Sequence, residues 1–219
     1  MITQEYITYF EELSANNNKE WFDKNRKRYE EHVRLPFIEL VESLIPGLME
    51  IEPSILPDAK KALFRINRDI RFSADKTPYN TMMKAGLSPG GKKSELPGFY
   101  LGIGTDFVHM GGGLYQLDKD VLKNVRLLIA AHTDEFLDIL SNPSFKKHFG
   151  ELKGDQNKRI DPEFQSVTDR TNYILNKQFY AMATLPTSQF INESNQAEAL
   201  MGYYRAVQPL HSFLNKAFT

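Results

Sequence analysis

Charged side chains gather in one short stretch of the chain, residues 64–79, which reads FRINRDIRFSADKTPY. It carries three arginines, one lysine and two aspartates among apolar residues whose alternation is typical of a buried strand. Charge on a core-facing segment is unfavourable unless it is paired or binds something. Planar guanidinium groups can hold a phosphate or a carboxylate through two parallel hydrogen bonds, and a lysine adds a point charge. The stretch therefore predicts a site for a small anionic ligand.

The wider region around this stretch, residues 59–93, is strongly basic. It holds nine basic and two acidic side chains, a local balance of +7 in a chain of net charge −1, and Lys93 ends it. The ligand-binding candidates within it are Arg65, Arg68, Asp69, Arg71, Asp75, Lys76 and Tyr79. An internal ion-pair network of Arg68, Asp69 and Asp75 that locks the turn before Pro78 is an equally good interpretation of those three residues.

Three further candidates follow in residues 107–115. His109 is the best general acid or base in the chain if its face turns towards the arginine-rich stretch; otherwise it is a structural histidine. The three glycines at 111–113 could bring backbone amides close to an anion, or could mark a bulge or close strand–helix packing. Tyr115 could donate a hydrogen bond to a ligand or form the edge of the core. The glycines match neither a P-loop nor a dinucleotide fingerprint.

Composition excludes several classes of site. The chain has no cysteine, which excludes disulfides, cysteine-ligated zinc, iron–sulfur clusters and thiol nucleophiles. The remaining histidines lack metal-ligand spacing, so neither a metal site nor a cofactor is predicted. They are His32, His132, His148 and His211. HExxH and Gly-x-Ser-x-Gly motifs are absent.

Charge and hydropathy also limit the partners. A net charge of −1 provides no global attraction for nucleic acid, and no RNA-binding motif is present, so nucleic-acid binding is not expected. No apolar run reaches the ~20 residues of a membrane helix. The first residues lack the pattern of a signal peptide, which predicts a cytoplasmic protein. The residues do not indicate an oligomeric state.

The elements that must position these candidates are read from apolar spacing. Helices are predicted after Thr3, after Asn18 and from Leu35. Strands are predicted at 64–72, 82–87, 99–103, 107–110 and 179–185, with a hairpin turn at 105–106. Later helices are predicted from Asp118, from 133–134, at 143–149, at 168–176 and at 196–218. Residues 151–167 are predicted to be irregular. This order predicts one α+β domain over residues 1–219, a mostly antiparallel central sheet flanked by N-terminal and C-terminal helices.

Motifs spread along the chain resemble a widespread bacterial and fungal domain-of-unknown-function family. They are KEWF at 19–22, the FRIxRDxRFSxDKTPY pattern at 64–79, GFYL at 98–101, GGGxY at 111–115 and PLxxFL at 209–214. The resemblance covers nearly the whole chain and implies membership, but the family lends no catalytic residues because it carries no established activity. Between 154 and 185 the chain departs from the family pattern, with KRIDP at 158–162 and no following histidine.

Two functions remain in view. The first is binding of a small phosphate- or carboxylate-bearing ligand in a cleft between residues 65–79 and residues 99–115, and the residues leave open whether catalysis follows. The second is a non-enzymatic interaction or scaffold protein whose charged motif only stiffens the fold.

Overall fold

The computed structural model describes residues 1–92 and 94–218; Lys93, part of the basic region, lies outside them. Four antiparallel strands form one sheet in the order β1-β2-β3-β4. The strands are β1 (Met82–Leu87), β2 (Gly98–Gly104), β3 (Phe107–Leu114) and β4 (Phe179–Pro186). With helices before and after this sheet, the predicted α+β class is confirmed.

Helices make up most of the remaining chain. Before the sheet lie α1 (Gln4–Ala15), α2 (Lys19–Lys24), α3 (Arg26–Tyr29), the π-helical turn η1 (Glu30–Arg34), α4 (Leu35–Ile51) and α5 (Ala59–Ala62). Between β3 and β4 lie α6 (Lys119–Ala131), α7 (Thr133–Ser141), α8 (Pro143–Phe149), η2 (Pro162–Phe164), α9 (Gln165–Thr168) and η3 (Asn172–Leu175). After β4 come α10 (Thr187–Phe190), α11 (Gln196–Asn215) and η4 (Lys216–Phe218).

Local capping explains where several helices begin. The side chains of Asn18, Asp118 and Asn142 each accept a hydrogen bond from a backbone N–H of the first helical turn, as expected of these residue types. Thr3 precedes α1 but makes no such bond. The helix predicted at 168–176 is wrong: α9 ends at Thr168, and only the short turn η3 follows.

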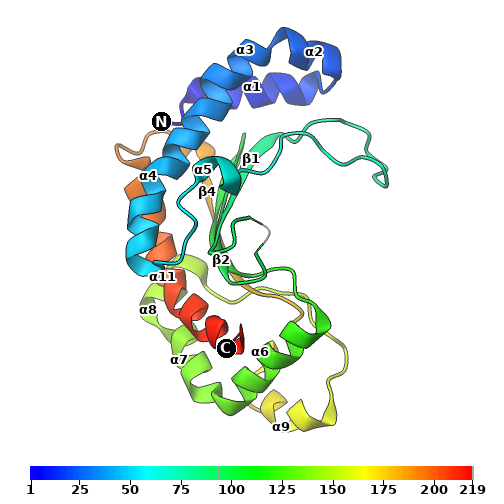
Figure 1. Ribbon diagram of the computed structural model, residues 1–219, viewed down its shortest axis with the longest axis vertical. Helices are drawn as coiled ribbons and strands as arrows, with labels where there is room; N and C mark the ends of the chain where they lie inside the picture. Colours follow the sequence, from blue (N-terminus) through cyan, green and yellow to red (C-terminus); the bar gives the residue numbers. More distant parts are fainter. Residues whose placement is uncertain (93, 219) are drawn as a thin grey trace.

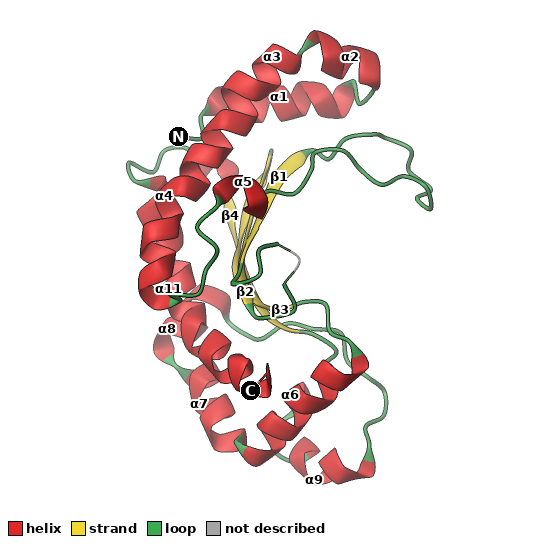
Figure 2. Ribbon diagram, in the orientation of Figure 1, coloured by secondary structure: helices red, strands yellow, loops and turns green. Residues whose placement is uncertain are grey.

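The ribbon curves into a crescent with the sheet at its middle (Figure 1). α4 and α11 run along the outer side of the crescent, α1 to α3 lie near one end, and α6, α7 and α9 lie near the other (Figure 2). The sheet face towards α11 is the core: Ala85, Leu101, Met110 and Ala183 pair across the four strands and are buried. We call the opposite face the inner face.

One predicted strand is absent. Residues 64–80, which we call the arm, form no strand and extend away from the sheet beside β1 (Figure 1). Isolated bridges join Leu63, just before the arm, to Ala85, and Asn67 to Tyr79 within it. Phe72, near the tip of the arm, is 96% exposed. The alternation of apolar and polar residues is real, but a strand needs a neighbour along its whole length, and the arm runs past the end of β1.

None of the helices in the described part of the chain has both the length and the apolar character needed to cross a bilayer.

Candidate functional site

Four positions line up across the inner face. Lys84 on β1 pairs with Gly102 on β2, Gly102 with His109 on β3, and His109 with Thr184 on β4. Residues paired directly across antiparallel strands project from the same face. Neighbouring strands are about 5 Å apart, so the backbones of Lys84 and His109 are about 10 Å apart. Gly102, which has no side chain, leaves a gap between them in this row.

The hydroxyl of Tyr100 occupies part of that gap. Gly102 has no side chain, and a Cβ built there would lie 2.8 Å from Tyr100 Oη. The tyrosine side chain therefore lies along β2 over Gly102. This position puts a hydrogen-bonding hydroxyl between Lys84 and His109.

His109 is held in place by Thr184. Its Nδ1 lies 3.2 Å from Thr184 Oγ1, and its Nε2 has no hydrogen-bond partner among the residues that the structure describes. Burial lowers the pKa of His109 below its ordinary value of 6.5, and the positive charges of Lys153 and Lys84 lower it further. His109 is therefore mainly neutral at pH 7, and in the tautomer whose Nδ1–H donates to Thr184 Oγ1 its Nε2 is free to accept a proton.

The two lysines beside His109 are not neutralised. Lys153 reaches this face through a bridge with Tyr180 that continues the sheet beyond β4. Within the described residues, the ammonium groups of Lys84 and Lys153 make no hydrogen bond or ion pair, and none of the inner-face positions of the four strands is acidic. An anion between these lysines would be stabilised, and so would negative charge developing on it.

Two tyrosines extend this surface. Tyr115 is 66% exposed, and its ring meets that of Tyr180 edge-on at 5.2 Å. Burial, with Tyr115 adding to it, raises the pKa of Tyr100 and also that of Tyr180. His109 and Tyr115, both candidates from the sequence, thus lie on the same side of the sheet.

The arm uses most of its own charges internally. Arg68 Nη1 lies 2.5 Å from Asp75 Oδ2 and 3.1 Å from the carbonyl oxygen of Thr77, and it also contacts the Thr77 hydroxyl. Asp75 Oδ1 accepts the Thr77 N–H at 2.9 Å. That N–H, together with the Arg68 guanidinium and the Thr77 hydroxyl, lowers the pKa of Asp75 to about 2. The geometry of this network is that of a locked turn.

A second pair lies closer to the tip. Arg71 donates to both carboxylate oxygens of Asp69, at 2.9 and 2.7 Å, and this bonding lowers the pKa of Asp69. Lys76 Nζ donates to the carbonyl of Ile70 at 3.0 Å. Arg65 is exposed, and its guanidinium has no partner in the described part of the chain. Arg65 is therefore the arm residue whose charge is most available to a ligand.

Tyr79 lies in the core rather than beside a ligand. Its side chain is 6% exposed, and its ring stacks on Phe22 with the centroids 4.1 Å apart. Asn17 also bonds both backbone groups of Tyr79, at 3.0 and 3.1 Å. Tyr79 anchors the base of the arm, because a buried, stacked ring has no surface left for a ligand.

The glycines at 111–113 serve packing. Both backbone edges of this stretch pair with neighbouring strands, so their amides do not form an anion-binding loop. A Cβ at Gly112 would lie 2.6 Å from Cε1 of His211 on α11, which shows the close strand–helix packing expected as one alternative. Gly113 has φ +132°, a conformation that favours glycine.

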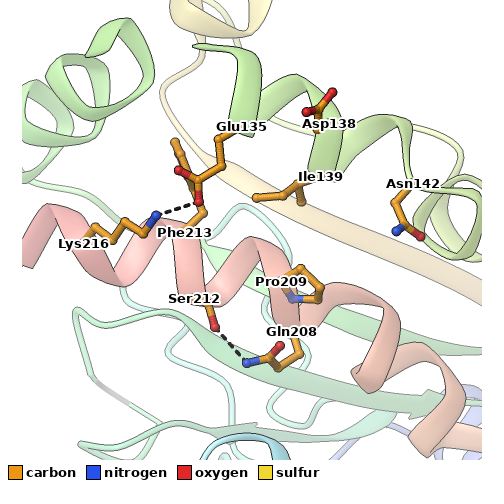
Figure 3. Close-up of a pocket in the computed structure, with 9 residues that line it drawn as sticks. All are labelled: Glu135, Asp138, Ile139, Asn142, Gln208, Pro209, Ser212, Phe213 and Lys216. Atoms are coloured by element: carbon orange, nitrogen blue, oxygen red, sulfur yellow. Dashed lines mark hydrogen bonds and ion pairs between the residues drawn. The ribbon is translucent and has the colours of Figure 1, made fainter. Parts of the chain in front are cut away.

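Other hollows and clusters do not resemble an anion site on this face. A hollow of about 690 Å³ lies between α7 and α11 (Figure 3). Its polar groups bond one another, Glu135 with Lys216 at 2.6 Å and Gln208 with Ser212 at 2.8 Å. Among the described residues, no three potential metal ligands lie together.

Lys84 was counted only as one of the nine basic residues of 59–93, and Tyr100 and Lys153 were not singled out in the sequence. Lys84 and Tyr100 occupy the polar parity of correctly predicted strands, which is a usable signal for a solvent-facing side chain. Lys153 stands in a segment expected to be irregular, and nothing local relates it to His109.

Comparison with known proteins agrees with the motifs described above. No curated protein matches the chain. Residues 5–213 match the family described as a conserved hypothetical protein, DUF2461. The match spans almost the whole chain, including the arm, the four strands and most of α11. This chain therefore belongs to the conserved hypothetical protein family DUF2461.

Proposed function

We propose that the chain binds a small phosphate- or carboxylate-bearing ligand on the inner face, beside His109. The observation that carries this proposal is the pair of lysines, Lys84 and Lys153, whose positive charges act on His109 and which form no ion pair with a carboxylate among the described residues. The arm begins beside Lys84, whose carbonyl accepts the Phe64 N–H at 2.9 Å, and its exposed Arg65 offers a further charge. We expect the binding to take place in the cytoplasm.

Catalysis is a possible extension of the same arrangement. A neutral imidazole with an open Nε2 can remove a proton from a bound ligand, and Lys84 can stabilise the negative charge that results. Thr184 would hold the ring through Nδ1. These roles make His109 the residue that we propose as the acid–base group.

Calorimetric titration with inorganic phosphate tests the binding. Wild type should bind phosphate, and Lys84→Gln should weaken binding about tenfold, since a charge-assisted hydrogen bond is lost. Lys146→Gln is the matched control, because Lys146 is exposed on α8, away from this face. Equal affinities for the two variants would contradict the proposal.

The titration of His109 by NMR gives a second, independent readout. Without ligand its pKa should lie below 6.5, and it should rise in Lys84→Gln because one of the neighbouring positive charges is gone. Bound phosphate should raise it further, because an anion favours the imidazolium. If phosphate leaves this pKa unchanged, the anion does not bind beside His109.

The exposed tip of the arm supports a second candidate, a protein-interaction role. Phe72 is almost fully exposed on a loop that the Arg68 network braces, and Arg71 lies over its ring at 5.9 Å. Aromatic and arginine side chains are enriched in protein interfaces. This alternative predicts that Phe72→Ser changes association of the protein in sedimentation experiments and that phosphate binding is absent.

A further inference from the structure

A second hollow, of about 730 Å³, lies between α6 and the segments that precede β4. That volume is within the range of small-molecule sites. Its lining includes the basic residues Lys119, Lys123, Arg126 and Lys177, the acidic residues Asp120 and Asp161, and the apolar or aromatic residues Tyr115, Leu117, Leu122 and Phe164. The lining is thus both basic and partly apolar.

Arg126 is the unusual residue in this hollow. It is only 7% exposed, and its Nε and Nη2 donate to the backbone carbonyls of Ile174 and Asn176, at 3.1 and 3.2 Å. Both acceptors are neutral, and within the described residues no carboxylate forms an ion pair with it. Its Nη1 has no hydrogen-bond partner there. A buried guanidinium without a counter-charge is unfavourable, and a bound anion would offset that penalty.

The neighbouring charges do not supply the missing partner. Asp161 acts on Arg126 only at longer range, since no ion pair forms between them. Lys123 is 3.8 Å from Glu163 and is partly neutralised by it. Lys119 and Lys177 are exposed at the edge of the hollow. The lining thus holds four basic and two acidic side chains, and none of the acidic ones forms an ion pair with Arg126 in the described part of the chain.

Arg126 lies on the buried side of α6, so its charge does not serve to hydrate the protein surface. Its neighbours on the buried side of the helix are Val125 and Ile129, both fully buried. Burying a charged residue among the apolar residues of an amphipathic helix lowers the stability of the fold unless the charge is compensated. Two backbone carbonyls orient the guanidinium and leave one edge open.

We propose that this hollow binds a small organic acid. The carboxylate or phosphate group of the acid would accept a hydrogen bond from Nη1 of Arg126, and the apolar part of the acid would lie against Leu122 and Phe164. The hollow adjoins the inner face at Tyr115, but its anion-binding group is Arg126, so this proposal does not depend on the one beside His109.

Calorimetric titration with benzoate, phenyl phosphate and benzyl alcohol tests this proposal. Benzoate or phenyl phosphate should bind wild type, and the tighter of the two identifies the anionic group preferred. Arg126→Gln, which keeps an amide donor for the carbonyls, should weaken binding about 10- to 100-fold. Lys177→Gln should weaken it by a smaller factor, while Lys84→Gln and Lys146→Gln should leave it unchanged.

Three outcomes would overturn the proposal. The first is that neither acid binds saturably up to about 10 mM. The second is that benzyl alcohol binds as tightly as the acids, which would make the hollow a purely apolar site. The third is that Lys84→Gln weakens the acids as much as Arg126→Gln does. If Arg126→Gln does not fold, the double variant Lys119→Gln and Lys177→Gln takes its place, because both side chains are exposed and their loss should not disturb folding. The double variant should bind the acids more weakly than wild type, and unchanged binding would overturn the proposal.

Discussion

The arm and the inner face of the sheet differ in how their charges are neutralised. The arm has the densest charge in the sequence, yet Arg68 and Arg71 are bonded to Asp75 and Asp69 within the arm itself. The inner face has few charges, contributed by separate elements, and Lys84 has no partner among the described residues. Available charge on the inner face is therefore supplied by Lys84 and Lys153, which lie outside the densest charged stretch of the sequence.

The physical reason lies in sequence distance. Opposite charges two to seven residues apart meet in a turn, because the chain between them is short. Lysines placed by different strands have no such neighbour unless the fold supplies one. The following predictions test whether the sheet is the rigid support and the arm a locally braced appendage.

The largest effect is expected from Gly111→Ala on β3. A Cβ at this position would overlap the carbonyl oxygen of Ala181 on β4, so the two strands must separate. The free energy of unfolding should fall by about 3 kcal/mol in urea denaturation. Gly104→Ala is the control, since its Cβ would be 3.5 Å from the nearest atom, and it should be nearly neutral. Equal losses would mean that the sheet is not tightly packed at Gly111.

The next effect concerns the covered face of the sheet, where His211 is fully buried. Neither ring nitrogen has a partner in the described structure, and burial lowers the pKa of His211 to about 3. The unfolded chain therefore takes up a proton below about pH 6.5, and the folded chain does so only near pH 3. The stability that neutral His211 contributes is complete above pH 6.5 and is lost as pH falls towards 3, at up to about 1.4 kcal/mol per pH unit.

Urea denaturation from pH 7 to pH 4 measures this dependence. His211→Leu should flatten the pH profile, whatever it does to the stability at pH 7. His109→Gln is the comparison on the inner face and should flatten it less, since His109 is less buried. An unchanged profile in His211→Leu would contradict the prediction.

A smaller and local effect is expected in the arm. Arg68→Ala removes the bonds to Asp75 and Thr77, so the turn should open while the sheet stays folded. Chymotrypsin should then cut faster after Phe72, with little change in the Tm. Arg65→Ala is the matched control, and its cleavage rate should equal that of wild type. A large fall in Tm for Arg68→Ala would show that the arm supports the core.

The smallest effect is expected from Phe72→Ser. An almost fully exposed side chain contributes little to folding, so the free energy of unfolding should change by less than about 0.5 kcal/mol. A clear loss of stability in urea denaturation would show that Phe72 is covered in solution.

Much of the fold was predictable because its determinants are local. Asn18, Asp118 and Asn142 cap the helices that follow them, and the alternation in 82–87 and 98–114 marks strands that have neighbours. The same alternation failed at 64–72, since no strand lies beside the arm. Of the residues that the proposals use, His109 and Tyr115 were candidates from the sequence, whereas Lys153 on the inner face and Arg126 in the second hollow were not.

The amino-acid sequence alone determined the family, the α+β class, the helix starts and the hairpin, because capping, apolar spacing and long motifs act over a few residues. Only the tertiary structure decided which charges are neutralised. That depends on the register that places Lys84, His109 and Thr184 in one row, and on the segments that bring Lys153 to His109 and the carbonyls of η3 to Arg126. The sequence around each of these residues does not indicate which distant residues will lie beside it. Coulomb interactions depend on the distance in space, which only the fold sets.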